Sequence, residues 1–338
     1  MPKPTIREVA ARAGVSISVA SNALNHKGRV SKETRRRVED AARAIGYVPS
    51  YTARRLRGAG KAIGILVITT SPDETLSTRY FGESLHTLLQ AVAQADYKLH
   101  YIYFPNQEFD ETQLRRTLSD DAVDGLVVMA PPPSKIGVIT RALKSMPYVL
   151  FSVASDQEGV SYVDSDGRSG ALSATRHLIA LGHTRVAYVM PYADNFDAVT
   201  RRQGYEAAMA EADLTARVYV PPDGCVPRAV KAMLVDEITA VLTFDDICAL
   251  EVIGELGRCG RRVPHDMAVI GFDDDIFGQW MCPRLTTVRQ PLSEMAAISA
   301  EYLIRRFESD GEVPPCHRVL PVELVVRESC GASLRAGG

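Results

Sequence analysis

The chain has 338 residues and a net charge of −2, from 39 Lys and Arg against 41 Asp and Glu. This length exceeds one small domain, and no apolar run approaches a membrane span, so we expect a cytoplasmic protein with no membrane partner. Residues 1–60 hold 13 basic and 4 acidic side chains, a balance of +9, whereas residues 61–338 hold 26 and 37, a balance of −11. This asymmetry favours a nucleic-acid module joined to an acidic domain over a merely solvated charged face.

The first predicted helix begins after Thr5 and ends at Gly14. Thr5-Ile6-Arg7-Glu8 forms a capping box, because the hydroxyl accepts from the Glu8 amide while the carboxylate accepts from the Thr5 amide. Gly14 supplies the positive φ of a tight turn, and Ser16 caps the next helix.

The second predicted helix has two different sides. The apolar side consists of Val15, Val19, Ala20, Ala23 and Leu24. The other side consists of Ile17, Ser18, Ser21 and Asn22. Small, mostly polar side chains suit a helix that enters a groove. A third helix follows Ser31 and stops at Gly46, so three short helices are expected to form a DNA-binding headpiece.

A fourth, very short helix is predicted between Tyr47 and Gly58. Pro49 disfavours helix before it, Ser50 caps a new helix, and Gly58 stops that helix after about two turns. Such a helix is unstable alone in water, because nucleation costs more than a few hydrogen bonds return. Three arginines beside Leu56 indicate that DNA orders it.

After Lys61, strand-like runs alternate with helical stretches. The predicted strands are 62–68, 98–104, 125–129, 147–153, 185–190, 240–243 and 268–272. The predicted helices are 81–95, 170–181, 201–212 and 247–256. This α/β alternation predicts two doubly wound parallel sheets with a crevice between them.

The chain resembles the lactose-repressor (LacI) family of bacterial transcription regulators. The resemblance rests on residues 5–25, on Gly46-Tyr47-x-Pro49 and on Ala53-Arg54-x-Leu56-Arg57. It continues through Arg201-Arg202-x-Gly204-Tyr205, Phe244-Asp245-Asp246 and Val269 to Asp274. It therefore covers nearly the whole chain, and it implies a sensor related to periplasmic sugar-binding proteins (the type I periplasmic-binding-protein-like fold).

The resemblance implies a division of the chain into four parts. These are a helix-turn-helix headpiece (1–48), a hinge helix and linker (49–60), an effector-binding and dimerisation domain (61–330) and a flexible tail (331–338). Within the third part, subdomain 1 is assigned residues 61–162 and 290–320. Subdomain 2 is assigned residues 163–289 and 321–330.

The resemblance also implies how double-stranded operator DNA is bound. The second helix would lie in the major groove, and Leu56 would enter the minor groove at the operator centre. The residues assigned to DNA are Thr5, Ser16, Ile17, Ser18, Ser21, Asn22, Asn25, Arg29, Tyr47, Ala53, Arg54, Leu56 and Arg57. Val19 departs from the family, which often has Thr there, so one phosphate contact is missing.

Six residues are assigned to an effector by the same resemblance: Tyr80, Phe81, Ser152, Arg201, Asp245 and Asp273. Arg201 would hold a hydroxyl pair or a carboxylate with its planar fork, and Asp273 would accept from ring hydroxyls. Each has a structural alternative: a surface ion pair for Arg201, a helix N-cap for Asp273, a loop cap for Asp245, and ordinary core for the two aromatics. Ser152 stands where sugar-binding members frequently place Asp, and this departure weakens a simple sugar assignment.

The expected protein is a homodimeric repressor that a small molecule, a sugar or sugar derivative, releases from a palindromic operator. The alternative within this class is a corepressor-dependent regulator whose nucleobase-like ligand tightens DNA binding. Two-fold pairing is expected at Leu85 to Val92 and at Trp280 to Cys282.

No nucleophile elbow, P-loop or dinucleotide loop is present, and the His and Cys spacings do not match a metal site, so we expect no enzyme activity, cofactor or metal. A solute-binding or enzymatic domain with an incidental basic arm is the alternative of a different class.

Overall fold

The computed structural model describes most of the chain. The described residues are 5–24, 30–45, 47, 62–69, 79–105, 109–120, 123–129, 131–143, 146–191, 193, 195–221, 224–309 and 313–335. The predicted hinge helix and its residues Ala53, Arg54, Leu56 and Arg57 lie outside these ranges, as do Asn25 and Arg29.

Three helices form the N-terminal unit: α1 (Ile6–Ala13), α2 (Ile17–Leu24) and α3 (Lys32–Ala44). The capping box of Thr5 and Glu8 is present, Gly14 has a φ of +63°, and the Ser16 hydroxyl accepts from the Val19 amide at 3.2 Å. Ser31 likewise caps α3. Buried side chains from all three helices, such as Val9, Ala20 and Val38, make one small core. The predicted three-helix headpiece is confirmed.

One placement on α2 is wrong. Ser21, expected on the exposed side, retains only 7% of its accessible surface, whereas Ile17 on that side is 48% exposed. At about 100° per residue Ser21 lies about 40° from Ile17, within the side predicted to face outward, so the neighbouring helices cover part of that side.

The first sheet contains six strands in the order β11-β5-β4-β3-β1-β2, and every pair in it is parallel. Its strands are β1 (Ala62–Thr69), β2 (Lys98–Pro105), β3 (Gly125–Met129), β4 (Tyr148–Phe151), β5 (Tyr162–Ser165) and β11 (His317–Leu320). Four helices cover it: α6 (Arg79–Gln94), α7 (Glu111–Asp120), α8 (Pro133–Ala142) and α13 (Leu292–Glu308).

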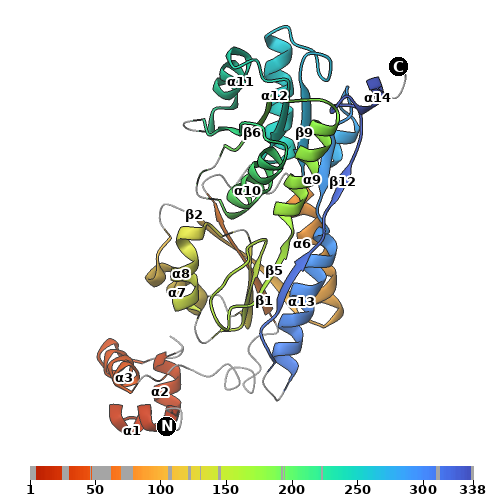
Figure 1. Ribbon diagram of the computed structural model, residues 1–338. Helices are drawn as coiled ribbons and strands as arrows, with labels where there is room; N and C mark the ends of the chain where they lie inside the picture. The colour runs from red at the N-terminus through yellow and green to blue at the C-terminus, as the bar shows by residue number, and fades with distance from the viewer. Residues whose placement is uncertain are drawn as a thin grey trace.

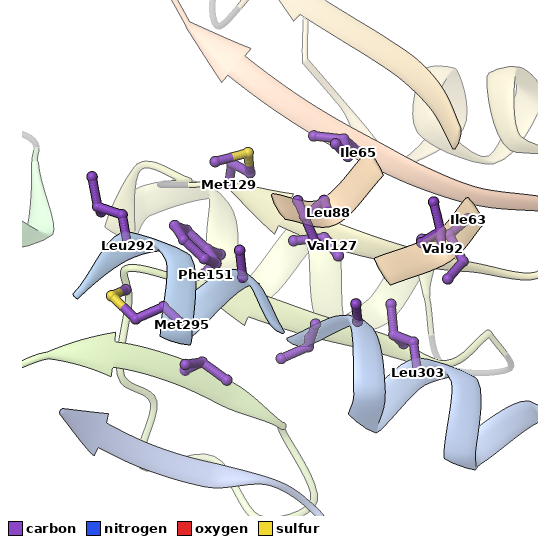
Figure 2. Close-up of a cluster of buried hydrophobic side chains, with 14 of the residues drawn as sticks. Ile63, Ile65, Leu88, Val92, Val127, Met129, Phe151, Leu292, Met295 and Leu303 are labelled. Atoms are coloured by element: carbon purple, nitrogen blue, oxygen red, sulfur yellow. The ribbon is translucent and has the colours of Figure 1, made fainter. Parts of the chain in front are cut away.

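Alternating residues of β1 face opposite sides of this sheet, as a strand requires. Ile63 and Ile65 pack with α6 and α13, where Leu88 and Leu303 are fully buried (Figure 2). Leu66 and its neighbours on the other face pack with α7 and α8. Both faces are therefore covered, which explains why β1 reads as a continuous apolar run.

The second sheet has the order β12-β10-β9-β8-β6-β7. Its strands are β6 (Val186–Val189), β7 (Arg217–Tyr219), β8 (Ala240–Thr243), β9 (Ala268–Phe272), β10 (Thr286–Arg289) and β12 (Glu323–Val325). Its helices are α9 (Gly167–Ala180), α10 (Phe196–Glu211), α11 (Val226–Val235), α12 (Asp246–Arg258) and the short 3₁₀ helix η3 (Ile276–Gln279). The two doubly wound sheets are confirmed, except that β12 runs antiparallel to β10 at one edge.

The chain passes three times between the two sheets, after β5, after β10 and after β11 (Figure 1). The passing segments are hydrogen-bonded to one another. The Asp166 amide donates to the Leu320 carbonyl at 2.8 Å, and the Ser165 hydroxyl donates to the Gln290 side chain at 2.6 Å. The two sheets are thus joined by a compact bundle of crossing segments.

Two predicted boundaries are wrong. Helix α10 starts at Phe196 rather than 201, because Asn195 caps it by accepting from the Ala198 amide at 2.9 Å, so Arg201 lies inside the helix and not at its end. The tail, predicted to be flexible, contains the short helix α14 (Ala332–Arg335), because Ala332 packs against the core of the second sheet.

Candidate functional site

Arg201 is the centre of the site. Its side chain is 2% exposed, and its guanidinium carbon lies 3.7 Å from the centre of the Phe272 ring and 4.9 Å from that of Phe244. The Nη1 group donates to the Phe244 carbonyl at 2.6 Å. Stacking and this hydrogen bond hold the fork in one orientation. The alternative of a surface ion pair is therefore wrong.

The Arg201 fork lies between two carboxylates without forming a hydrogen bond to either. Its Nη2 atom is 3.6 Å from Asp273 Oδ1 and 3.7 Å from Asp197 Oδ1, and its buried Nε has no hydrogen-bond partner. A buried donor of this kind is costly unless something accepts from it. The arrangement can therefore bind a polar molecule that supplies an acceptor.

Asp273 directly follows β9 and has a φ of +104°. Its carboxylate accepts from Gln290 Nε2 at 2.6 Å, and Gln290 in turn accepts from the Ser165 hydroxyl. It is not a helix N-cap, since the next helical turn, η3, has Asp275 at its N-cap position. Burial raises the pKa of Asp273, and the Arg201 charge only partly offsets this effect.

Asp245 caps α12 by accepting from the Cys248 amide at 2.7 Å, so the alternative of a cap is correct for this residue. Burial, together with the charge of Asp273, raises the pKa of Asp245 to about 7. The carboxylate therefore has a structural role and also lies within electrostatic reach of the site.

Tyr80 lies in the core of the first sheet, edge-on to Phe151 with ring centres 5.9 Å apart, and Phe81 packs beside it. The alternative reading of Tyr80 as an ordinary core residue therefore fits its ring but does not account for its hydroxyl. The buried hydroxyls of Tyr80 and Ser152 have no hydrogen-bond partner of good geometry. Burial raises the pKa of Tyr80, the charge of Asp197 adds to this effect, and the neighbouring Ser152 hydroxyl partly offsets it.

Sequence reasoning missed Asp164 and Asp197. Asp164 lies near the carboxyl end of β5, Asp197 lies in the first turn of α10, and both side chains are buried. Burial raises the pKa of each, and their mutual proximity adds to the rise for Asp164. The available signal was an acidic residue at the carboxyl end of a parallel strand, where such folds bind ligands.

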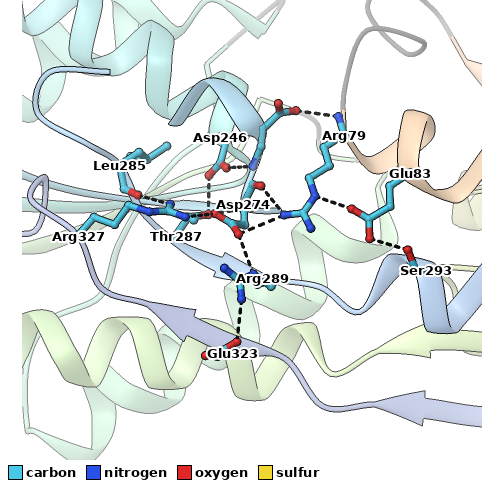
Figure 3. Close-up of polar contacts among 11 residues, drawn as sticks. Arg79, Glu83, Asp246, Asp274, Leu285, Thr287, Arg289, Ser293, Glu323 and Arg327 are labelled. Atoms are coloured by element: carbon cyan, nitrogen blue, oxygen red, sulfur yellow. Dashed lines mark hydrogen bonds and ion pairs between the residues drawn. The ribbon is translucent and has the colours of Figure 1, made fainter. Parts of the chain in front are cut away.

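Asp274, next to Asp273, belongs to a different network (Figure 3). It accepts from Arg289 Nε at 2.7 Å, from Arg79 Nη1 at 3.1 Å and from Arg327 Nη2. Burial alone would raise the pKa of Asp274, but the hydrogen bonds and charges of Arg327 and Arg289 lower it. Arg79 begins α6 on the first sheet, so this network joins the two halves.

A second contact supports the same junction. The Asp275 carboxylate accepts from the backbone amide of Arg79 at 2.8 Å, so a residue of one half caps a helix of the other. Asp246 fixes the turn that carries these residues, accepting from the Asp275 amide and the Thr287 hydroxyl at 2.6 Å each. Position 271 requires glycine, because the Cβ of any other residue would lie 2.0 Å from Asp246 Oδ1.

In the N-terminal unit, Ile17, Ser18 and Asn22 are exposed on one side of α2, as a helix that reads a groove requires. Thr5 and Ser16 use their hydroxyls in helix caps. Tyr47 packs against the headpiece core. These positions are compatible with a DNA surface, and the contacts themselves stay a prediction.

Two kinds of feature are absent from the described residues. None of their helices is both long and apolar enough to cross a membrane. Within the same ranges, no group of three or more His, Cys, Asp or Glu side chains is arranged to hold a metal ion.

Three family models match the chain. "Bacterial regulatory proteins, lacI family" matches residues 5–50, and "Periplasmic binding proteins and sugar binding domain of LacI family" matches residues 62–240. A "Periplasmic binding protein-like domain" matches residues 175–330. Together they span both the three-helix unit and the two sheets.

Relatives and solved structures agree over the full length. "HTH-type transcriptional repressor PurR" of Histophilus somni is 30% identical over 336 residues, covering 96% of this chain and 98% of that protein. The PurR of Aliivibrio fischeri is 29% identical, covering 98% and 99%. The "transcriptional regulator CelR-cellobiose complex" is 27% identical, with a TM-score of 0.72 and coverage of 97% and 100%. The lac repressor dimer bound to operator and the anti-inducer ONPF, at 24% identity and a TM-score of 0.68 over 97% and 99%, shares the fold.

Proposed function

We propose that this chain, which belongs to the LacI family of bacterial regulatory proteins and is a transcriptional repressor, is controlled by a small polar molecule held at Arg201 and Asp273. Members of this family bind operator DNA and a small effector and act as dimers. Enzyme activity has no part in the proposal, and neither has a metal or a cofactor.

One observation carries the assignment of the effector site. The Arg201 fork stacks on two aromatic rings, yet its Nε is buried and unpartnered, and the buried Tyr80 and Ser152 hydroxyls have only each other as partners among the described residues. Tyr80 and Ser152 come from the first sheet, and Arg201 comes from the second. A ligand that pairs with all three would bridge the two halves.

The adjacent contacts suggest how binding would reach the DNA. Asp273 contacts Gln290 and through it Ser165, both in segments that cross between the halves, while Asp274 contacts Arg79. A ligand that draws on Asp273 would therefore bias the relative position of the halves. In the proposed mechanism this change reaches the operator through segment 49–60, which lies outside the described residues. Coupling of this kind is typically about 1–3 kcal/mol, or roughly 5- to 150-fold in affinity.

Dimerisation would bring two headpieces to an approximately palindromic operator. The expected pairing surfaces include exposed apolar side chains, with Leu89 on α6 at 47% exposed and Trp280 at 76% exposed. Large exposed apolar side chains are typical of interface residues.

Two ligand classes follow from the relatives. A regulator solved with cellobiose supports a carbohydrate inducer, and the homologues named PurR support a nucleobase-type corepressor that tightens DNA binding. We propose the first as the working assignment and keep the second as the alternative. The two classes differ in their effect on operator affinity: an inducer lowers it and a corepressor raises it.

The test begins with a thermal-shift screen of the full-length protein against sugars, sugar phosphates and nucleobases. Calorimetry with the stabilising compound should then show at least a tenfold loss of affinity in Arg201→Ala and Asp273→Ala. Operator affinity without ligand should stay within about threefold. Arg202→Ala is the matched control, because Arg202 is exposed on the same helix and pairs with Glu206. Unchanged ligand affinity in both site variants would place the effector elsewhere.

A further inference from the structure

The site has more negative than positive charge. Four carboxylates lie around one guanidinium: Asp197 and Asp273 within 3.7 Å of Arg201, and Asp164 and Asp245 within electrostatic reach of it. If all are ionised, three negative charges are uncompensated. Arg79, the other cation that acts on Asp273, is already paired with Asp274 and Glu83.

The four carboxylates also accept few hydrogen bonds from uncharged donors. Asp273 accepts from Gln290, and Asp245 accepts from the Cys248 amide. Asp164 accepts from the backbone amides of Ser165 and Ala154. Asp197 has only the 3.7 Å approach of Arg201 in the described structure. Buried carboxylates normally have an opposite charge and several hydrogen bonds, so this set lacks a cation.

A second, independent observation shows that the cluster is a ligand site and not merely an acidic region. Arg201 Nε is buried and has no hydrogen-bond partner, and the buried Ser152 and Tyr80 hydroxyls interact only with each other among the described residues. The charges of Asp197, Asp273 and Asp164 all raise the pKa of Tyr80, so its hydroxyl lies within their electrostatic reach. The hydroxyls can accept from an ammonium group, and Arg201 Nε requires an acceptor oxygen on the same ligand.

We propose that the molecule recognised here carries a protonated amine or amidine as well as hydroxyl or carbonyl oxygens. This inference rests on the proposed function, since it concerns the same site. The cationic group lies between Asp197 and Asp164 and accounts for the excess carboxylates, while an oxygen of the ligand accepts from Arg201. A neutral sugar or nucleobase would satisfy Arg201 and leave the carboxylates without a counter-charge.

Protonation behaviour supports this chemistry. Burial raises the pKa of Asp164 to about 7 and that of Asp197 to about 6, so near pH 7 this pair is partly protonated and a bound cation would displace the proton. Binding of an amine should therefore release protons, whereas binding of its neutral counterpart should release fewer.

The experiment compares ligands that differ by one charge, using the full-length protein at pH 7. The pairs are D-glucosamine with D-glucose, D-galactosamine with D-galactose, and putrescine with 1,4-butanediol; adenine and hypoxanthine serve as neutral nucleobases. At least one amine should raise the melting temperature and bind at least tenfold more tightly than its hydroxyl partner. Calorimetry in two buffers of different ionisation enthalpy should show proton release with the amine.

Substitutions locate the effect. Asp197→Asn and, as a second variant, Asp164→Asn keep the side-chain shape and should each weaken the amine at least tenfold. Asp156→Asn changes an exposed carboxylate and should leave its affinity unchanged. The inference is overturned if neutral members bind as tightly as amines, if no amine stabilises the protein, or if both buried variants bind the amine normally.

The outcomes also separate this inference from the proposed function. A neutral ligand that depends on Arg201 and changes operator affinity would overturn the cationic ligand and leave effector control intact. An amine that depends on Asp197 but does not change operator affinity would confirm the cation site and overturn control of the operator through it.

Discussion

Asp273 and Asp274 are neighbours in sequence but occupy opposite electrostatic environments. Asp273 shares one guanidinium with three other carboxylates, and its pKa is raised by burial. Asp274 is a single carboxylate held by three guanidiniums, and its pKa is lowered. Both residues have a positive φ, +104° and +56°, and this turn directs adjacent side chains into different networks.

The difference separates charges that are paired within the fold from charges that we propose to be paired by a ligand. The cations of Asp274 come from α6, from β10 and from the segment after β12, so its network is complete without any other molecule. The Asp273 cluster contains more carboxylates than cations and an unpartnered buried atom, Arg201 Nε, so its network is incomplete within the described residues. Complete buried networks stabilise a fold, and incomplete ones are typical of functional sites.

The largest effect is expected from Asp274→Asn. The substitution keeps the shape but leaves three guanidiniums without their common counter-charge, and breaking a buried pair in this way costs about 3 kcal/mol. Urea unfolding should show this loss in the free energy of unfolding. The matched change Asp273→Asn removes one of several mutually repelling carboxylates and should cost less than about 1 kcal/mol. Equal losses in the two variants would contradict the comparison.

A smaller effect with a definite pH dependence is expected from Asp245→Asn. The folded-state pKa is about 7 against an ordinary value of 3.8, so between about pH 4 and 7 the folded state holds a proton that the unfolded state has lost. Its contribution to stability therefore falls as the pH rises through this window. Asn keeps the cap on α12 without the charge, and it should add about 1 kcal/mol at pH 8 and less at pH 4. Thermal unfolding at both values measures this gain, and a gain that is larger at pH 4 would show the assignment to be wrong.

The smallest effect is expected from Arg289→Gln. Its side chain is 40% exposed, and it is one of three cations on Asp274, so the loss should be about 0.5 kcal/mol. The same substitution at Arg327, which is 12% exposed, should cost more. Urea unfolding of the two variants side by side gives this order. The reverse order would mean that burial does not rank the cations of this network.

Local chemistry made parts of the fold predictable. The capping box at Thr5, the turn at Gly14 and the apolar strands at 240–243 and 268–272 lie where the sequence predicts them, because each depends on residues close together in the chain. The start of α10 was misplaced because Asn195, its cap, stands outside the apolar pattern. The predicted strands do not include five short ones, β5, β7, β10, β11 and β12, because strands of three or four residues carry little local pattern and depend on pairing with distant strands.

The site was predictable only in part. Arg201 and Asp273 were named from a resemblance, and the structure brings them within 3.6 Å. Asp197 has no periodic signature and becomes visible only when α10 is placed against the sheets. The contact of Arg79 with Asp274 joins residues 195 positions apart, and no local pattern encodes such a distance.

The three passages of the chain between the sheets have an evolutionary consequence. Neither half is a contiguous stretch of sequence, since the strands of the second sheet come from residues 186–289 and 323–325. Exchange of that half between two relatives by recombination must therefore transfer two separate pieces together. A single breakpoint would combine β12 of one parent with β10 of the other, and the antiparallel edge pair would then join strands that had not been selected together.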